Sequence, residues 1–417
     1  MWRYSGIDKF DLDAYVPASP QAPGRGSQAA LEAARRVADA LGPRSGLVVT
    51  RNGMVEAVEM DPAAPEALAV TSARGAGPSG PATAETLGVL APGRDAFGEL
   101  HDAFVADVVF MRVARKVVAP HPVVVVHLVA ADAGRALGVS VFPRTLVELG
   151  ESAEAGIIEL TVPDVVGNAL PAGGEAEANP GVVLVVPVTE LHVGDDARLR
   201  YANLQVLGKG ATFIAVQASR VGRDATLRSF TAGLGGRYAR VRTDSDLVGQ
   251  AGRTALLAAY LGTGEQIHDF RTLQDHQAPR SESQLLFKGA VADTARSVYS
   301  GLIRIRKGAR GANAFQTNHN LVLSEGAHAD SVPNLDIDEN DVKCSHASTV
   351  GPIDEDQRYY LETRGIEPAV AERLIVLGFF ADLARQAPFP GVGRWVEDAV
   401  QRRMAGRLSA PEAGSHG

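Results

Sequence analysis

Cys344 and His346 are the side chains of this sequence best suited to bind a metal together. Cys344 is the only cysteine in the chain, and His346 follows it by two positions, between Asp341 and Gly351. Successive side chains of an extended strand point to opposite faces, so Cys344 and His346 are predicted to share one face. A thiol and an imidazole can bind a soft or borderline metal. Two ligands are too few to hold a metal alone, so such a site would be incomplete within this chain.

The composition is that of an ordinary soluble globular protein, with 45% hydrophobic and 22% charged residues. A net charge of −8, without a basic stripe, argues against a nucleic-acid binder. The first residues do not read as a secretory signal, and no uninterrupted apolar stretch is long enough to cross a membrane as a helix. A single cysteine excludes an intrachain disulfide and fits a reducing compartment. We therefore expect a cytoplasmic protein that contacts no membrane.

Three regions follow from the pattern along the chain, with boundaries at 1–110, 111–353 and 354–417. The first is a mixed helical region that contains a tight hairpin at Asn52-Gly53 and a mobile Ala/Gly/Pro-rich loop at 62–92. The middle region is a long series of short strands without crossover helices, which excludes a doubly wound α/β fold. The last region is predicted to be helical and to end in a disordered tail.

Helical spacing of apolar residues predicts helices at 28–41 and 95–105, and one helical stretch at 250–261 inside the strand region. In the last region, three acids at 354–356 open a helix, Gly365 follows it, and Pro368 opens the next. A third helix carries Trp395. The apolar side chains of these helices, including Leu374 and Leu377, are expected to pack in the core.

A short repeat favours a β-helix for the middle region. Gly289, Gly308 and Gly326 each precede an alanine, and their separations along the chain are 19 (308 − 289) and 18 (326 − 308). Small residues at fixed corners are typical of stacked coils that bury a continuous core. The repeat therefore predicts that the spacing of these glycines is the length of one coil.

Two long motifs resemble the SufB/SufD family of iron–sulfur cluster assembly scaffolds. They are residues 327–337, Ala-His-Ala-Asp-Ser-Val-Pro-Asn-Leu-Asp-Ile, and residues 341–346, Asp-Val-Lys-Cys-Ser-His. Residues 283–289 and 356–366 continue the match. The Cys-Ser-His triplet and the Gly-Pro-Ile-Asp at 351–354 are most like SufD. Where the family usually has Gly-Ala after that histidine, this chain has Ala-Ser.

The resemblance implies a mainly β fold, with a right-handed parallel β-helix core flanked by N-terminal and C-terminal helical regions. It implies a non-catalytic subunit that pairs with a SufB-like subunit and docks the ATPase SufC. It also implies that a transient iron or iron–sulfur cluster is handled at the interface with SufB, and that none is held by this chain alone.

Cys344 and His346 are the metal ligands that the resemblance favours, in a site shared across that interface. Iron–sulfur clusters generally need about four ligands, mostly thiolates, so a second protein must contribute the others. For the contact with an ATPase, the exposed candidates on the C-terminal helices are Glu362, Arg364 and Arg394.

Several alternatives stay open. Cys344 could be inert in a strand core, in which case the chain would be a SufB-like or purely structural interaction scaffold without a metal role. The acids from Asp336 to Asp341 read as a solvated coil edge, although they could hold iron transiently. His276, His319 and His328 are expected to have packing or turn roles. A polysaccharide-acting β-helix enzyme and a Cys–His nucleophile are both disfavoured, because no carboxylate pair and no orienting third residue can be identified.

Overall fold

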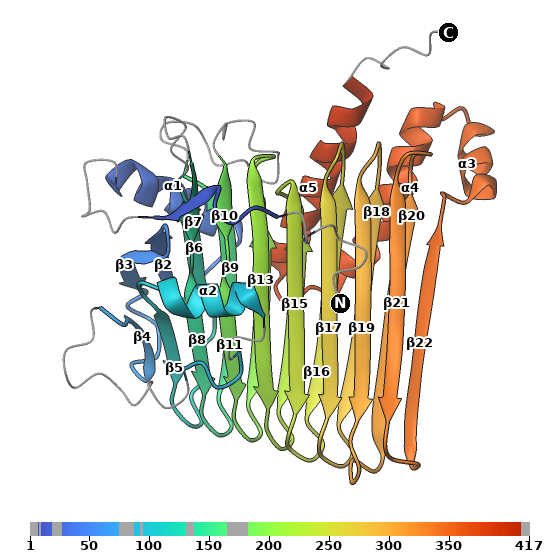
Figure 1. Ribbon diagram of the computed structural model, residues 1–417. Coiled ribbons are helices and arrows are strands. Elements are labelled where there is room, and N and C mark those ends of the chain that lie inside the picture. The colour runs from blue at the N-terminus through green and yellow to red at the C-terminus, as the bar shows by residue number, and fades with distance from the viewer. Residues whose placement is uncertain are drawn as a thin grey trace.

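The computed structural model describes residue 7 and residues 10–18, 27–74, 87–91, 95–130, 137–164 and 182–409. The fold is mainly β, with 49% strand and 19% helix, and it forms a β-solenoid of about 7 turns with flanking helices. The strands stand side by side along one axis (Figure 1). The predicted β-helix core with helical flanks is confirmed.

Among the described residues, the solenoid has two sheets that face each other, here called sheet A and sheet B. Sheet A contains β1 (Tyr15–Pro17), β4 (Leu68–Ser72), β5 (Val109–Val113), β7 (Gly138–Val141), β8 (Arg144–Leu149), β10 (Val183–Val185), β11 (Val188–Val193), β13 (Ala211–Val221), β15 (Tyr238–Leu247), β17 (Ile267–His276), β19 (Arg296–Ile305) and β21 (His328–Ile337). Sheet B contains β2 (Gly46–Arg51), β3 (Met54–Met60), β6 (Val123–Val129), β9 (Glu154–Pro163), β12 (Arg198–Gln205), β14 (Thr226–Gly233), β16 (Arg253–Gly262), β18 (Glu282–Val291), β20 (Ala312–Val322) and β22 (Val342–Gly351).

Parallel pairing between successive coils sets the length of one coil. Tyr238 pairs with Ile267, and Ile267 pairs with Arg296, so the residue number rises by 29 at each step (267 − 238 and 296 − 267). At the next step, from Arg296 to His328, it rises by 32 (328 − 296). The coil length predicted from the short repeat is therefore wrong. Each coil must supply two strands and two corners, which needs a longer stretch of chain than the short repeat provides.

The three glycines of that repeat occupy different places in the coil. Gly289 lies within β18, beside the ring of Tyr260, whereas Gly308 and Gly326 lie in the turns after β19 and β20. Gly308 has a positive φ of 93°, which its turn requires.

A different set of glycines marks the true coil. Gly150, Gly194, Gly222 and Gly249 occupy one corner of successive coils, and the last two separations are 28 (222 − 194) and 27 (249 − 222). A Cβ on Gly249 would lie 2.1 Å from the backbone carbon of Gly222 and 1.9 Å from the backbone nitrogen of Arg223. The chain therefore stacks on itself so closely at this corner that no side chain fits.

The interior between the sheets is largely apolar, with a buried Glu159 that is hydrogen-bonded to His127, and it is rich in aromatic rings towards the C-terminal coils. Tyr260 stacks on Phe270 with ring centroids 4.5 Å apart, and Phe287 packs edge-on against both Phe270 and Tyr299. Each ring comes from a different strand. Aromatic pairs of this kind stabilise a core beyond the area that they bury, so they tie neighbouring coils together.

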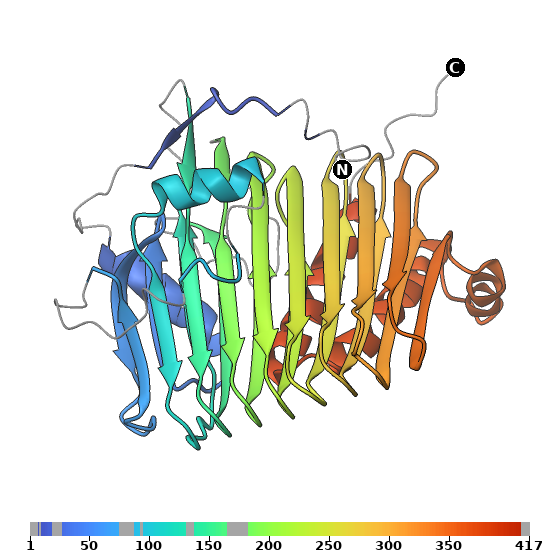
Figure 2. The ribbon, with the colours of Figure 1, turned by 60° about the horizontal axis from the view of Figure 1, so that its bottom comes forward.

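Five helices are described: α1 (Ser27–Ala40), α2 (Ala96–Phe104), α3 (Glu355–Glu362), α4 (Pro368–Arg385) and α5 (Pro390–Ser409). Helices α1, α4 and α5 share a second apolar core with the outer face of sheet B, and Figure 2 shows α4 and α5 behind the strands. Helix α2 lies across sheet A. Pro368 opens α4 and Gly365 follows α3 with a φ of 83°, as predicted.

The prediction of a helix at 250–261 is wrong, because Arg253–Gly262 forms the strand β16. Its alanines and leucines favour a helix locally, but pairing with β14 and β18 on both sides overrides that preference. The tight hairpin at Asn52-Gly53 is confirmed, with φ values of 48° and 81°.

Part of the loop expected at 62–92 forms β4, while 75–86 and 92–94 lie outside the described residues. The tail beyond residue 409 also lies outside them.

Replacing Gly249 with alanine tests the corner stack. Gly249→Ala should lower the free energy of unfolding by about 1–3 kcal/mol, because the added methyl meets backbone that cannot rotate away. Gly351→Ala is the matched control, since a Cβ there meets no atom within 4 Å and should change stability by less than about 0.5 kcal/mol. Urea denaturation of both variants measures the difference, and equal stabilities would contradict the stacked corner.

Candidate functional site

The solenoid ends in two strands whose outer edges have no partner in the described part of the chain. β21 pairs only with β19, and β22 pairs only with β20. Two inward side chains at the C-terminal end of β21 are exposed: Leu335 by 38% and Ile337 by 42%. Their neighbours on β19, Ile303 and Ile305, are fully buried. Terminal repeats of solenoids normally carry a polar cap, so this apolar end is an uncapped core.

Cys344 and His346 lie on β22 at this uncapped end. Cys344 pairs with the buried Ala314 and His346 with the buried Gln316, whereas Ser345 between them pairs with the exposed Phe315. The two side chains therefore share the inward face, as predicted. Cys344 is half-buried against an apolar cluster that includes Ile303 and Ala314, and His346 is exposed.

The surroundings of Cys344 do not favour a thiolate. Burial raises the pKa of the Cys344 thiol, so the isolated chain keeps its thiol protonated at neutral pH. Lys343 is exposed on the opposite face of the strand. Among the described residues, no group of three or more His, Cys, Asp or Glu side chains could hold a metal ion. Cys344 and His346 thus remain an incomplete pair within this chain.

Sequence reasoning missed a buried amide directly beneath His346. Gln316 is 1% exposed, and neither atom of its amide has a hydrogen-bond partner within the described structure. The Tyr299 hydroxyl lies beside the amide, close enough to interact with it, and the absent side chain of Gly301 leaves the space for both. Buried polar groups are usually paired, so an unpaired amide here is unusual. The alternation of β20 is the sequence signal that places Gln316 inward, but its position beneath His346 depends on the register with β22, which the sequence does not give.

The other predicted histidines are spread over separate places. His276 is buried and hydrogen-bonded by both ring nitrogens to the hydroxyls of Ser281 and Ser283, each at 2.8 Å, and burial lowers its pKa to about 4. His328 lies on β21, 3.2 Å from Asp330. His319 faces outward from the middle of β20, between two buried asparagines, and does not sit at a corner.

Two of the acids between Asp336 and Asp341 have structural partners. Asp336 accepts a hydrogen bond of 2.9 Å from Arg304. Glu339 accepts backbone hydrogen bonds from Gly308 and Asn340, and these lower its pKa. Glu339 therefore joins the last corner to the corner before it.

The proposed partner-binding residues of the C-terminal region lie on α3, in the turn that follows it and on α5. Glu362 is 3.5 Å from Arg358 on α3, and Arg364 lies 5.0 Å above the ring of Tyr360. Arg394 is exposed on α5. Trp395 is buried and Leu377 partly buried, as expected.

The prediction that Leu374 packs in the core is wrong, because Leu374 is 43% exposed on α4. Tyr359 on the neighbouring α3 is 69% exposed. Both side chains lie on the helices that extend past β22 (Figures 1 and 2). They give this end of the molecule an apolar surface outside the solenoid.

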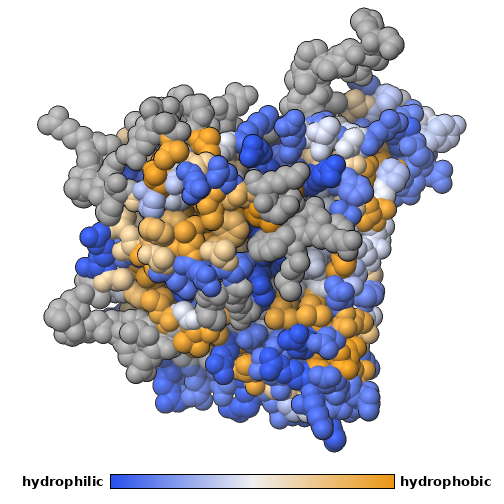
Figure 3. Space-filling model, viewed as in Figure 1, coloured by the Kyte–Doolittle hydropathy of each residue, from blue (hydrophilic) through white to orange (hydrophobic). Residues whose placement is uncertain are grey.

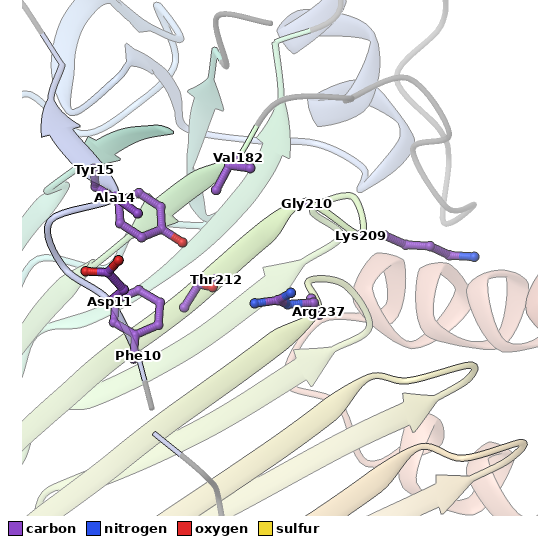
Figure 4. Close-up of a pocket in the computed structure, with 9 residues that line it drawn as sticks. All are labelled: Phe10, Asp11, Ala14, Tyr15, Val182, Lys209, Gly210, Thr212 and Arg237. Atoms are coloured by element: carbon purple, nitrogen blue, oxygen red, sulfur yellow. The ribbon is translucent and has the colours of Figure 1, made fainter. Parts of the chain in front are cut away.

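A separate pocket of about 300 Å³ lies between the N-terminal segment and the start of β13 and β15 (Figure 4). Its lining includes Asp11, Tyr15, Thr212 and Arg237. The Arg237 side chain extends towards Thr212. β17 and β19 separate this pocket from β21, so it does not belong to the site at the uncapped end.

Comparison with known proteins identifies the fold's family. A family model described as "SUF system FeS cluster assembly, SufBD core domain" matches residues 129–379, more than half of the chain. The chain belongs to the SufB/SufD family. An iron–sulfur cluster assembly SufBD family protein of Mycobacterium tuberculosis is 35% identical over 223 residues, covering 52% of this chain and 56% of the relative.

Within the SufB/SufD family, the chain is most like SufD. SufD of Bacillus subtilis is 32% identical over 227 residues, covering 54% of this chain and 52% of that protein. SufD of Escherichia coli is 28% identical over 312 residues, covering 75% and 70% respectively. The chain spans about half the length of the first of these relatives. No described helix has the length and apolar character needed to cross a membrane.

Alkylation of Cys344 tests its environment, because every labelled thiol reports on this one residue. The rate follows the thiolate fraction, and burial raises the pKa of Cys344. At pH 7 the folded chain should therefore react more slowly with iodoacetamide than the same chain unfolded in guanidinium. The midpoint of its rate–pH profile should also lie at higher pH. If the midpoint for the folded chain lies at the same pH as the midpoint for the unfolded chain, or at a lower pH, the raised pKa of Cys344 is contradicted.

A matched pair of substitutions tests the Gln316 amide. Gln316→Leu should raise the free energy of unfolding of the isolated chain by about 1–3 kcal/mol, because it removes an unsatisfied buried group. Asn318→Leu, the next inward position, should lower it by a similar amount, because Asn318 donates to the Tyr260 hydroxyl and the Phe287 carbonyl. If urea denaturation shows that both variants are destabilised, the amide is satisfied in solution.

Proposed function

We propose that this chain is a non-catalytic, SufD-like subunit of a cytoplasmic iron–sulfur cluster assembly scaffold. It pairs with a SufB-like subunit through the edges of β21 and β22. The observation that supports this most directly is that the only cysteine and His346 lie at the uncapped end of the solenoid. The family assignment also supports the proposal, because the matching family model is that of the SUF system of iron–sulfur cluster assembly.

Two physical costs favour a partner at this end. The outer edges of β21 and β22 present backbone groups that another strand can satisfy. Leu335 and Ile337 expose apolar area that a second core would remove from water. One partner that adds strands to both sheets meets both requirements.

The cargo of the proposed site is iron or a nascent iron–sulfur cluster. Cys344 and His346 supply at most two of about four ligands, so the partner supplies the remainder. A thiolate bound to metal no longer needs a low pKa of its own, because the metal stabilises the negative charge. The raised pKa of free Cys344 is therefore compatible with a site that becomes competent only when the partner and the metal arrive.

The C-terminal helices are the proposed docking surface for the ATPase SufC. Tyr359 and Leu374 provide exposed apolar area, and Arg364 and Glu362 provide charges at the end of α3. Arg394 on α5 is a further contact in this proposal. Because α4 packs on β16 and β18, motion of an attached ATPase would reach the solenoid directly.

A second candidate is a purely structural scaffold in which Cys344 stays inert. The raised pKa of the thiol and its contact with the apolar cluster of Ile303 and Ala314 favour this candidate. Both candidates predict assembly with a SufB-like partner, but only the first predicts that His346 or Cys344 affects cluster formation.

Co-expression with the SufB-like and SufC subunits tests the proposal. The wild-type chain should copurify with both, and the loaded complex should transfer its cluster to an apo-ferredoxin. His346→Ala should copurify normally but lower that transfer at least about tenfold, and Cys344→Ala should lower it less. His121→Ala, an exposed histidine far from β22 in the fold, is the control and should behave as wild type.

Two results would count against the proposal. A wild-type chain that stays monomeric in the presence of both subunits would remove the assembly role. Wild-type transfer by both the His346→Ala and the Cys344→Ala complexes would leave the structural scaffold as the better description.

A further inference from the structure

A row of charged side chains crosses the outer face of sheet A and stops at the free edge. Successive strands place these residues in register, one from each of β13, β15, β17, β19 and β21: Arg220, Asp246, Asp275, Arg304 and Asp336. They lie near the C-terminal ends of their strands. The lowest part of the molecule in Figure 3, towards which the strands of sheet A run in Figure 1, is mostly hydrophilic.

The same row continues towards the N-terminus. His192 on β11 is the register partner of Arg220, and Glu148 on β8 is the partner of His192. Arg112 on β5 closes the series and is 2.7 Å from Glu148. The row therefore runs through every strand on the path from β5 to β21, rather than being a local surface cluster.

Opposite charges are register neighbours at four steps of the row: Arg112–Glu148, Arg220–Asp246, Asp275–Arg304 and Arg304–Asp336. Burial lowers the pKa of His192, so this side chain is neutral at pH 7 and interrupts the alternation. Arg304 donates to Asp336 at 2.9 Å. The one like-charged step, between Asp246 and Asp275, is bridged by Arg306, whose Nε donates to Asp275 at 2.9 Å and whose pKa both carboxylates raise. Like charges directly opposite each other in a sheet are destabilising, so this step needs its bridging cation.

The row ends in an anion at an edge strand. Asp336 has Arg304 on one side, and on its other side β21 has no partner strand in the described part of the chain. The adjoining corner adds Asp338, Glu339 and Asp341, all close to Asp336 in the chain. Among cations, Arg310 lies 3.9 Å from Glu339. A strand arriving at this edge therefore meets a negative field.

We propose that Asp336 selects and registers the strand that pairs with β21. The incoming strand belongs to the partner subunit and carries a lysine or arginine beside Asp336, so that the row continues as cation, anion and cation across the interface. This inference rests on the proposed function, because it names the chemistry of the partner strand at the same edge.

The ion pair at Asp336 is expected to determine the register of the incoming strand more than the affinity of the complex. An exposed ion pair changes a binding equilibrium by about fivefold at most. A misplaced strand would lose this gain and would also set an acid or an apolar side chain against Asp336, which is a larger penalty. A single carboxylate at the edge can therefore discriminate between registers that backbone pairing alone would accept.

Binding of the purified SufB-like partner to three variants at low and high salt tests the inference. Asp336→Asn should weaken binding about two- to fivefold and reduce its salt dependence. Asp336→Lys should weaken binding at least about tenfold at low salt, with a smaller loss at high salt. Glu265→Lys makes the same charge change at an exposed corner between β16 and β17, and it should bind as wild type.

The outcomes separate this inference from the proposed function. A wild-type chain that does not bind the partner overturns both. Wild-type binding together with an Asp336→Lys variant that binds like Glu265→Lys overturns the charged row alone. If Asp336→Lys melts at a lower temperature than wild type, its weaker binding could reflect lost stability, and the Asp336→Asn variant is then the test. An affinity and a salt dependence of Asp336→Asn equal to those of wild type would overturn the inference. The inference is supported if a partner variant with an acid in place of its basic residue binds Asp336→Lys as tightly as the wild-type pair bind each other.

Discussion

Stacking of one coil on the next is the constraint on which this structure depends. Each strand satisfies its backbone groups only through the strands of the neighbouring coils, and each inward side chain is covered by the coil above and the coil below. The glycine corner shows how close that stacking is. A stack of this kind has no intrinsic end, so its last coil always leaves an edge and an apolar layer that something else must cover.

The proposed metal-binding residues lie where the stack stops. In an inner coil, Cys344 and His346 would face other side chains of the same protein, as His276 does, and would be closed to a ligand. On β22 they face the space where the next coil would be. The position that is costly for the isolated chain is thus the position where a shared site can form. Burial raises the pKa of the Cys344 thiol, which disfavours its reactive thiolate form in the free chain.

The strand-rich pattern together with the family resemblance was sufficient to predict the architecture, whereas the short repeat gave the wrong coil length. Strand-rich character, the hairpin at Asn52-Gly53 and the C-terminal helices all depend on local signals, and the structure confirms them. The predicted coil length was wrong because Gly and Ala are abundant, and three Gly-Ala pairs fell at a regular spacing without occupying the same position in the coil. The true corner glycines were present in the sequence, but the step from Gly150 to Gly194 is much longer than the two steps that follow it, and this irregularity hides their period.

The site could be predicted only to the extent that it is local. Two residues on one strand share a face by strand geometry alone, so Cys344 and His346 could be paired from the sequence. Gln316 and the charged row depend on register between strands a full coil apart, and the coils differ in length. An error of a single position moves a side chain to the other face of the sheet. Such relationships therefore become visible only once the coils are stacked. The same rule applies to the proposed partner strand at β21, because its register would determine which side chain meets Asp336.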